Sequence, residues 1–186
     1  NMFQSDVPTP RILAPADVLE SVRNDLFNDR LWPDLVRLST PDASLVELVE
    51  LPADTPTEVG SVRVTPIAIN HVVPTYAYLL DEPGCSVLVV TDTGETTRVW
   101  ECARECDDLA GVFIESAFPE SQQGLARDSG HLTPLGMARQ LDQIGRPVRS
   151  IVVHLNPLVR DILVTEIEAL GREELEIGLP GTIYEF

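Results

Sequence analysis

The stretch Cys85-Ser-Val-Leu-Val-Val-Thr-Asp-Thr-Gly94 decides how this chain folds. Residues 85–90 form an apolar run with the length and composition of a strand buried on both faces. Asp92 and Gly94 end the run, so we expect the carboxylate at the carboxyl tip of a central strand. An aspartate there is most often a turn residue that hydrogen-bonds its own backbone. A function for Asp92 therefore requires other reactive groups at the same edge of the sheet.

Two of the three histidines share this placement at the end of an apolar run. His71 follows the run 62–69, and His154 follows the run 150–153. If these runs are strands of one sheet, both imidazoles and Asp92 emerge at one edge, where they can bind a divalent ion such as zinc. The spacing is not that of a compact metal motif. For each histidine, a hydrogen-bonded structural role near a strand end is the alternative.

The third histidine, His131, precedes a predicted helix. Thr133 followed by Pro134 indicates a helix start, because threonine caps the free amides and proline is tolerated in the first turn. His131 therefore lies in a loop beside a helix amino terminus, where an imidazole can face a phosphate and transfer a proton. The alternative is that Gly130 and His131 form only a surface turn.

Length and composition indicate one globular domain with a core, since 44% of the 186 residues are hydrophobic and 23% are charged. The charge is strongly negative: 13 arginines against 30 acidic residues give a formal net charge of −17. Such a field argues against binding to nucleic acid or to an anionic membrane. An anionic substrate would need a local positive charge, which a bound metal ion can supply.

The cysteines and the hydropathy bear on the compartment. Cys85, Cys102 and Cys106 are odd in number and include no Cys-x-x-Cys pair, which is typical of reduced thiols. No secretory segment and no long apolar span is evident in the sequence. The compartment stays open, with the cytoplasm favoured over the periplasm.

The hydrophobic periodicity predicts a layered α/β fold, because apolar strand-like runs alternate with helical patterns. Near the amino end, we expect a helix over 17–27, a strand over 44–51 and a loop over 52–60, with Phe27 and Trp32 buried. Further along, the predicted strands are 62–69, 75–80, 85–90, 110–114, 150–153 and 176–186, and the predicted helices are 95–106, 157–170 and one starting at 134.

Several segments together resemble class II cyclic-nucleotide phosphodiesterases of the metallo-β-lactamase superfamily. They are Asn70-His-Val-Val-Pro74, Val90-Thr-Asp-Thr-Gly94, Phe113-Ile-Glu-Ser-Ala-Phe-Pro119, Ser129-Gly-His-Leu-Thr-Pro134 and His154-Leu-Asn-Pro157, in the order found in that family. The likeness runs from about residue 10 to Phe186 and includes Phe27-Asn-Asp-Arg-Leu-Trp-Pro33. It implies an α/β fold of the αββα sandwich type, with residues 1–186 as a single domain that is mainly the C-terminal part of the sandwich.

The resemblance also implies roles for individual residues. His71 is similar to a ligand of the first metal, Asp92 to the carboxylate that bridges both metals, and His154 to a ligand of the second. His131 resembles a histidine placed near the leaving group. Two zinc ions would activate a water as the nucleophile, and His131 would donate a proton to the departing 3′ oxygen. The implied reaction is hydrolysis of cyclic AMP or cyclic GMP to the 5′-monophosphate.

One feature of the family is missing: no histidine precedes His71, so the signature His-x-His-x-Asp-His is absent. Either the chain lacks an upstream segment or it has lost half of its site. We expect the former, because His71, Asp92 and His154 are all present. Another hydrolase of the same superfamily and an inactive binding module are the alternatives. The expected partner is a small-molecule cyclic nucleotide, not nucleic acid or a membrane, with a homodimer left open.

Overall fold

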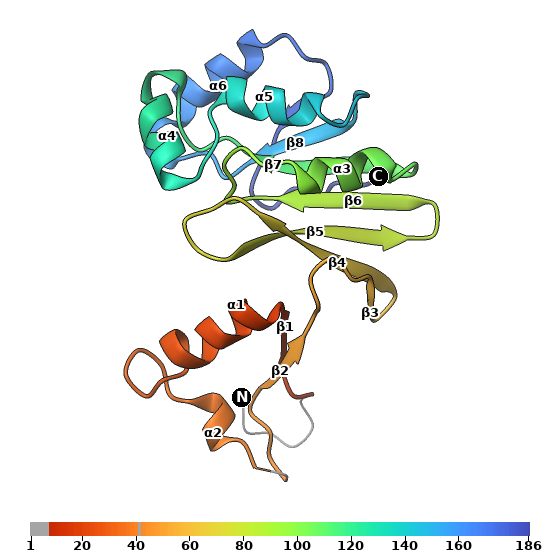
Figure 1. The fold of residues 1–186 in the computed structure, drawn as a ribbon. Helices are drawn as coiled ribbons and strands as arrows, with labels where there is room; N and C mark the ends of the chain where they lie inside the picture. Colours follow the sequence, from red (N-terminus) through yellow and green to blue (C-terminus); the bar gives the residue numbers. More distant parts are fainter. Residues whose placement is uncertain (1–7, 41) are drawn as a thin grey trace. The chain divides into compact units, whose positions relative to one another are not determined.

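The computed structural model describes residues 8–40 and 42–186, and the chain divides into two compact units, Asn1–Thr55 and Pro56–Phe186 (Figure 1). The expectation of a single domain over 1–186 stays a prediction. In the described part of the chain, no helix has the length and apolar character needed to cross a membrane.

The first unit is built on a short parallel strand pair, β1 (Arg11–Ala14) with β2 (Glu47–Glu50). Its helices are α1 (Ala16–Ser21), which continues as the π-helical turn η1 (Val22–Leu26), and α2 (Leu35–Leu38). The predicted helix is therefore present over nearly the expected length, although its second half is π-helical, and the predicted strand is present but shorter than expected.

Phe27 is buried as predicted, but the prediction that Trp32 is buried is wrong because this residue is 54% exposed. The backbones of these two residues form an isolated β-bridge. Between them, the Asn28 side chain accepts hydrogen bonds from the amides of Arg30 and Leu31. Because polar contacts close this loop, it does not depend on burial of the indole.

A seven-stranded mixed sheet organises the second unit. Its strands, in spatial and sequence order, are β3 (Thr57–Val59), β4 (Val62–Ile69), β5 (Thr75–Glu82), β6 (Cys85–Val90), β7 (Leu109–Glu115), β8 (Arg149–Val153) and β9 (Leu175–Ile177). Pairing is antiparallel from β3 to β6 and parallel from β6 to β9. Strand β6, which comes from the stretch Cys85–Gly94, is thus the strand at which the antiparallel half of the sheet meets the parallel half. Strand β3 lies within the segment predicted as a loop.

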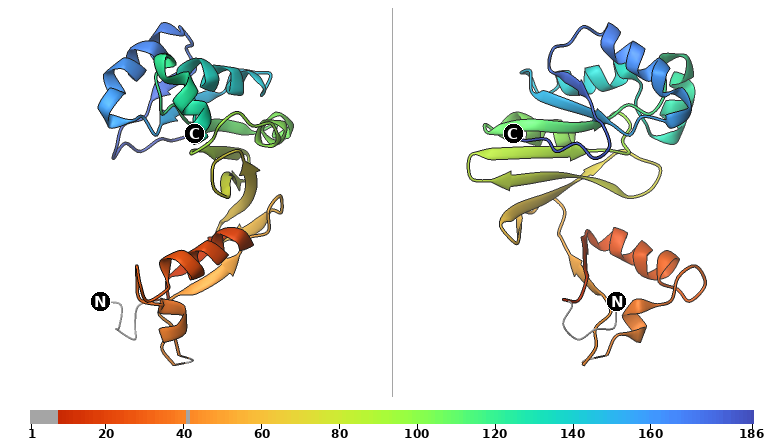
Figure 2. Two further views of the ribbon diagram at one scale, coloured as in Figure 1. Left: turned by 60° about the vertical axis from the view of Figure 1, so that its left-hand side comes forward. Right: turned by 180° about the vertical axis from the view of Figure 1, so that it is seen from behind.

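Three helices cover one face of this sheet, as Figures 1 and 2 show. They are α3 (Arg98–Glu105), α5 (Pro134–Asp142) and α6 (Arg160–Ala169). Their apolar faces pack on alternate residues of the strands, and the buried side chains include Leu88, Trp100, Ile114, Met137 and Leu163. Shorter helices lie in the connections: η2 (Glu120–Gln122) and α4 (Gln123–Ser129) lie between β7 and α5, and η3 (Pro157–Val159) lies between β8 and α6.

The carboxyl-terminal segment lies on the opposite face, where Phe113 stacks edge-on against Tyr184 and Phe186 (Figure 2). The predicted final strand over 176–186 is wrong beyond Ile177, where β9 ends. The turn through Pro180 and Gly181 diverts the chain, since proline cannot donate to a ladder and Gly181 has a φ of 79°.

Candidate metal centre and acid–base pair

The sheet topology brings the predicted ligands to one edge. Strands β4 and β6 run in the same direction because each is antiparallel to β5, and β6 is parallel to β7 and β8. The carboxyl ends of β4, β6, β7 and β8 therefore share an edge. His71 follows β4, Asp92 follows β6, and His154 follows β8.

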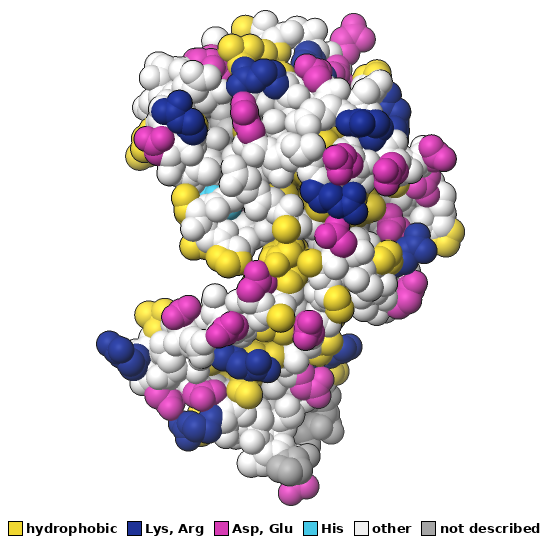
Figure 3. Space-filling model, in the orientation of Figure 1, with side chains coloured by type: hydrophobic (Ala, Val, Ile, Leu, Met, Phe, Trp, Pro, Cys, Tyr) yellow, Lys and Arg dark blue, Asp and Glu magenta, His cyan; other side chains and the backbone are white. Residues whose placement is uncertain are grey.

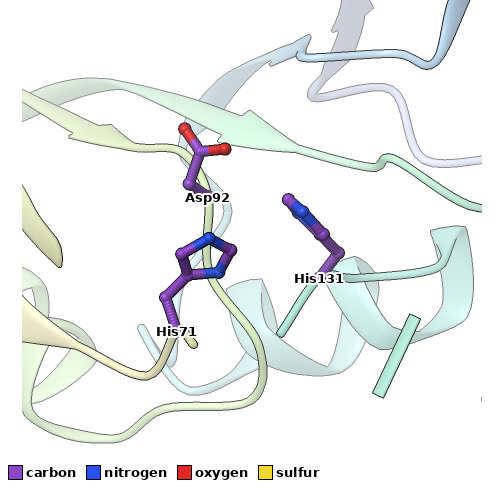
Figure 4. A group of neighbouring side chains, drawn as sticks. All are labelled: His71, Asp92 and His131. Carbon is purple, nitrogen blue, oxygen red and sulfur yellow. The ribbon is translucent and has the colours of Figure 1, made fainter. Parts of the chain in front are cut away.

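His71, Asp92 and His131 form the tightest group at this edge. Each offers one ligand atom, and these atoms all lie within 4.8 Å of one another. Figure 4 shows the three side chains directed toward a common space from three separate segments. From the side drawn in Figure 3, a small patch of histidine surface is visible in a depression of the second unit.

His154 lies next to this group. Its Nδ1 is 3.4 Å from Asp92 Oδ1, and its ring centroid is 5.5 Å from that of His131. The structure thus brings together all four residues proposed from the sequence, but it groups His131 more closely with His71 and Asp92 than the sequence suggested. Their individual roles stay predictions.

The tautomer of His71 suits metal binding. Its Nδ1 lies 2.9 Å from the carbonyl oxygen of Gly130, and a carbonyl can only accept, so Nδ1 carries the hydrogen. Nε2 is then left with its lone pair available to a metal, an arrangement common among metal-binding histidines. Gly130 has a φ of 71°, and a Cβ there would lie 2.9 Å from His71 Nδ1, so this position requires glycine.

Asp92 and His154 both adopt left-handed backbone conformations, with φ of 54° and 53°. Residues other than glycine seldom do so, and such strain is concentrated at functional sites. Both side chains are accessible, at 40% and 41% exposed. Two neighbouring residues at this edge of the sheet therefore both adopt an unfavourable backbone conformation, which supports a functional role for the edge.

Glu115 is the residue of this edge whose role the sequence did not suggest. It ends β7, is fully buried, and accepts hydrogen bonds from the amides of Thr93 and Leu132. His131 Nδ1 lies 2.9 Å from its Oε1. Desolvation raises the pKa of Glu115 to about 7, although the two amides act in the opposite direction. The sequence feature that could have indicated a role for Glu115 is its position as a carboxylate at the end of an apolar strand, which Asp92 shares.

His131 completes a carboxylate–imidazole pair with Glu115. Its side chain is 16% exposed, and desolvation lowers its pKa, while the charge of Asp92 acts to raise it. Since Nδ1 faces Glu115, Nε2 is the nitrogen left for the open part of the site. A carboxylate behind an imidazole suits either a metal ligand or a proton donor.

These donors fit a divalent ion. Imidazole nitrogens and a carboxylate oxygen are the ligand types of a zinc site, and the three ligand atoms all lie within 4.8 Å of one another. Within residues 8–40 and 42–186, this is the one group of three such donors found this close together. His131 also lines a cavity of about 500 Å³, together with Asn70, Arg127 and Arg139.

The chain was compared with protein-family models and with solved structures. Residues 4–155 match the family model described as beta-lactamase superfamily domain. Yeast PDE1, solved without ligand, superposes with a TM-score of 0.77 at 19% identity over 95% of this chain. The metallo-beta-lactamase fold protein YhfI from Bacillus subtilis gives 0.68 at 17% identity over 95% of this chain. Zinc-bound PqqB from Methylobacterium extorquens gives 0.62 at 13% identity over 98% of this chain.

This chain spans 60% of the yeast PDE1 chain, 65% of the YhfI chain and 67% of the PqqB chain. No sequence among curated proteins matches it significantly. At these identities the structural similarity concerns the fold, and the predicted α/β fold of the metallo-β-lactamase type is confirmed.

Proposed function

The chain belongs to the beta-lactamase superfamily domain family, a family of metallo-hydrolase fold, and from this premise we propose that its site hydrolyses cyclic nucleotides. The proposed reaction converts a 3′,5′-cyclic nucleotide to the nucleoside 5′-monophosphate. Because the chain spans 60% of yeast PDE1, the activity proposed is that of the whole protein to which this site contributes.

The observation that carries the proposal is the Glu115–His131 pair beside the group of His71 and Asp92. Hydrolysis of a phosphodiester needs a nucleophile, neutralisation of phosphoryl charge, and a proton for the leaving oxygen. Two divalent ions, the first bound by His71, the second by His154 and both by Asp92, would supply the first two requirements, by acidifying water and by their charge. The buried pair meets the third requirement.

His131 is the proposed general acid. Its Nε2 holds the proton that passes to the departing 3′ oxygen, and the resulting neutral imidazole stays hydrogen-bonded to Glu115 through Nδ1. Glu115 fixes the ring orientation and stabilises the protonated form during turnover. Glu115 is therefore a positioning residue, since the carboxylate touches His131 and not the substrate.

The substrate class rests on two supports. The five segments that resemble class II cyclic-nucleotide phosphodiesterases include His71, Asp92, His131 and His154, and yeast PDE1 has a similar fold. The cavity beside His131 is lined by Arg127 and Arg139, which bring positive charge near an anionic substrate in a protein of net charge −17, although Asp128 and Glu95 already pair with them. Zinc is the proposed metal, two ions per site, and zinc-bound PqqB supports the element.

The test is turnover of cyclic AMP and cyclic GMP by the zinc-supplemented protein, measured as 5′-monophosphate formed. His131→Ala is expected to keep its zinc and lose about 10²- to 10⁴-fold in rate, the usual contribution of a general acid. Loss of zinc in this variant would make His131 a ligand instead. Hydrolysis of a linear chromogenic phosphodiester without hydrolysis of either cyclic nucleotide would contradict the proposed substrate.

A further inference from the structure

A second cavity opens beside the candidate metal centre. It has a volume of about 410 Å³ and is lined mainly by apolar side chains. Its lining includes His154, Leu155, Pro157, Arg160, Leu179 and Tyr184. His154 belongs to the functional edge, because its Nδ1 is 3.4 Å from Asp92, so a ligand in this cavity would lie next to the reacting centre. The size is that of a small-molecule pocket.

Arg160 is the unusual member of this lining. In the described part of the chain, no hydrogen bond or ion pair joins its guanidinium to another residue, although it is half-buried. The other arginines of residues 56–186 all have at least one such partner: Arg63, Arg98, Arg104, Arg127, Arg139, Arg146, Arg149 and Arg172. In a protein with 30 acidic residues, the guanidinium of a half-buried arginine that has no partner in the described chain is available for a ligand.

Helix stability does not explain Arg160 either. The residue is the first of α6, where the helix dipole is positive and a cation is unfavourable. The part of the lining formed by Leu179 and Tyr184 is held in place, since the Tyr184 hydroxyl accepts a hydrogen bond from the amide of Leu179 and its ring packs edge-on against Phe113. The amide of Gly178 also bonds to the carbonyl of Val152, and a Cβ at Gly178 would lie 2.8 Å from Val153 Cγ1. The cavity is thus a mainly apolar pocket in which the guanidinium of Arg160 has no partner in the described chain.

This combination selects for a flat heterocycle with acceptors on one edge. Apolar and aromatic walls bury the faces of a base, and a guanidinium donates two parallel hydrogen bonds to a pair of acceptors. Guanine offers O6 and N7 as such a pair, whereas adenine presents an amino donor in place of O6. We propose that this cavity is the base subsite of the phosphodiesterase, and that Arg160 donates to O6 and N7 of a guanine, so that cyclic GMP is preferred over cyclic AMP. This inference rests on the proposed function.

The first test compares kcat/KM for the two cyclic nucleotides in the full chain. Wild type is expected to favour cyclic GMP, and Arg160→Ala to lose about 10- to 100-fold on cyclic GMP and less than about threefold on cyclic AMP, as for a lost bidentate contact. Arg104→Ala is the control, because Arg104 lies in the last turn of α3, outside the lining of this cavity, and donates a hydrogen bond to the carbonyl of Gln143. Arg160→Ala should fold normally, since no hydrogen bond or ion pair of the described chain is removed.

The second test separates the subsite from the reaction. Binding of guanosine and of adenosine, neither of which carries a phosphate, is measured by calorimetry with a metal chelator present. Guanosine is expected to bind more tightly, and Arg160→Ala to weaken guanosine by at least about tenfold. That result supports the subsite even if no phosphodiester is hydrolysed. Equal binding of the two nucleosides, or turnover whose cyclic GMP to cyclic AMP ratio is unchanged in Arg160→Ala, would overturn it while leaving the proposed function intact.

Discussion

Asp92 and His154 carry the strain of the functional edge in their own backbones. Both are left-handed residues directly past parallel strands, and their side chains face each other at 3.4 Å. The left-handed region costs an ordinary residue about 1 kcal/mol or more. A protein without use for these positions would gain stability by placing glycine there, so the conformation itself points to function.

Replacing Asp92 tests its proposed role as a ligand. Asp92→Asn keeps the shape and tolerates the left-handed backbone but removes the negative charge that holds a cation. We expect lower zinc content, measured on the purified protein, together with lower activity. Asp54→Asn is the matched control, because Asp54 is an exposed aspartate with a φ of 54° in the first unit. Full zinc content in Asp92→Asn would rule out the ligand role.

Glu115 makes stability depend on pH in the metal-free protein. Its pKa is about 7 in the folded chain against an ordinary 4.5, so its contribution is fully present below pH 4.5 and is lost as the pH rises through 7. The difference corresponds to about 3 kcal/mol. His131, with a lowered pKa, acts in the opposite sense, favouring the fold above its ordinary 6.5 and losing that contribution as the pH falls.

The measurement is urea unfolding of the metal-free protein at pH 5 and pH 8. Glu115→Gln cannot ionise, so the wild type should lose up to about 3 kcal/mol relative to this variant between the two pH values. Glu105→Gln is the control at an exposed carboxylate in the last turn of α3, and it should leave the pH dependence of unfolding unchanged. A difference between wild type and Glu115→Gln that is the same at both pH values would contradict burial of an ionisable Glu115.

At the scale of the elements, the site depends on the turn between α4 and α5. Gly130 caps the carboxyl end of α4 in a left-handed conformation, and its carbonyl accepts the Nδ1 hydrogen of His71. Three residues later, the Thr133 hydroxyl accepts the amide of Gly136 and starts α5. One short connection therefore ends a helix, orients a candidate ligand, presents His131 and begins the next helix.

Two glycine substitutions separate the contributions of this turn. Gly130→Ala and Gly145→Ala both place alanine at a positive φ, which costs about 1–2 kcal/mol in unfolding free energy. Only at Gly130 would the added Cβ meet His71, since nothing lies within 4 Å of the position at Gly145. We expect both variants to be less stable, but only Gly130→Ala to bind zinc more weakly, by about 10- to 100-fold. Equal zinc affinity in the two variants would show that this turn does not orient His71.

For the molecule as a whole, metal binding should couple to the stability of the second unit. Its candidate ligands come from segments far apart in sequence, 71, 92, 131 and 154, so an unfolded chain holds no such site. Zinc at about 100 times its dissociation constant adds about 2.7 kcal/mol, which raises the midpoint by about 5–10 °C.

The transition can be followed through Trp100, a fully buried residue of α3, after Trp32→Phe removes the exposed indole of the first unit. The midpoint is compared with zinc and with a chelator. Asp92→Asn should reduce or abolish the rise, which distinguishes specific binding from general effects of the salt. A midpoint that zinc leaves unchanged in the Trp32→Phe protein would count against a metal site in this chain.

Strand and helix positions were largely predictable because they depend on local chemistry. The strands over 62–69 and 85–90 begin and end as predicted, since apolar runs there meet turn residues on both sides. The start of α5 follows from the Thr133 and Pro134 cap. By contrast, β3, α4 and the irregular end after Ile177 have short or weakly periodic sequences, and tertiary packing decides their conformation.

By itself, the sequence determined which side chains stand at strand ends and before a helix, because hydrophobic periodicity and capping are encoded within a few residues. Only the tertiary structure decided which of these groups meet. The Glu115–His131 contact joins residues 16 positions apart, and Arg160 stands without a partner in the described chain. Such contacts depend on strand order, register and the packing of distant segments, and a local sequence pattern does not determine any of these.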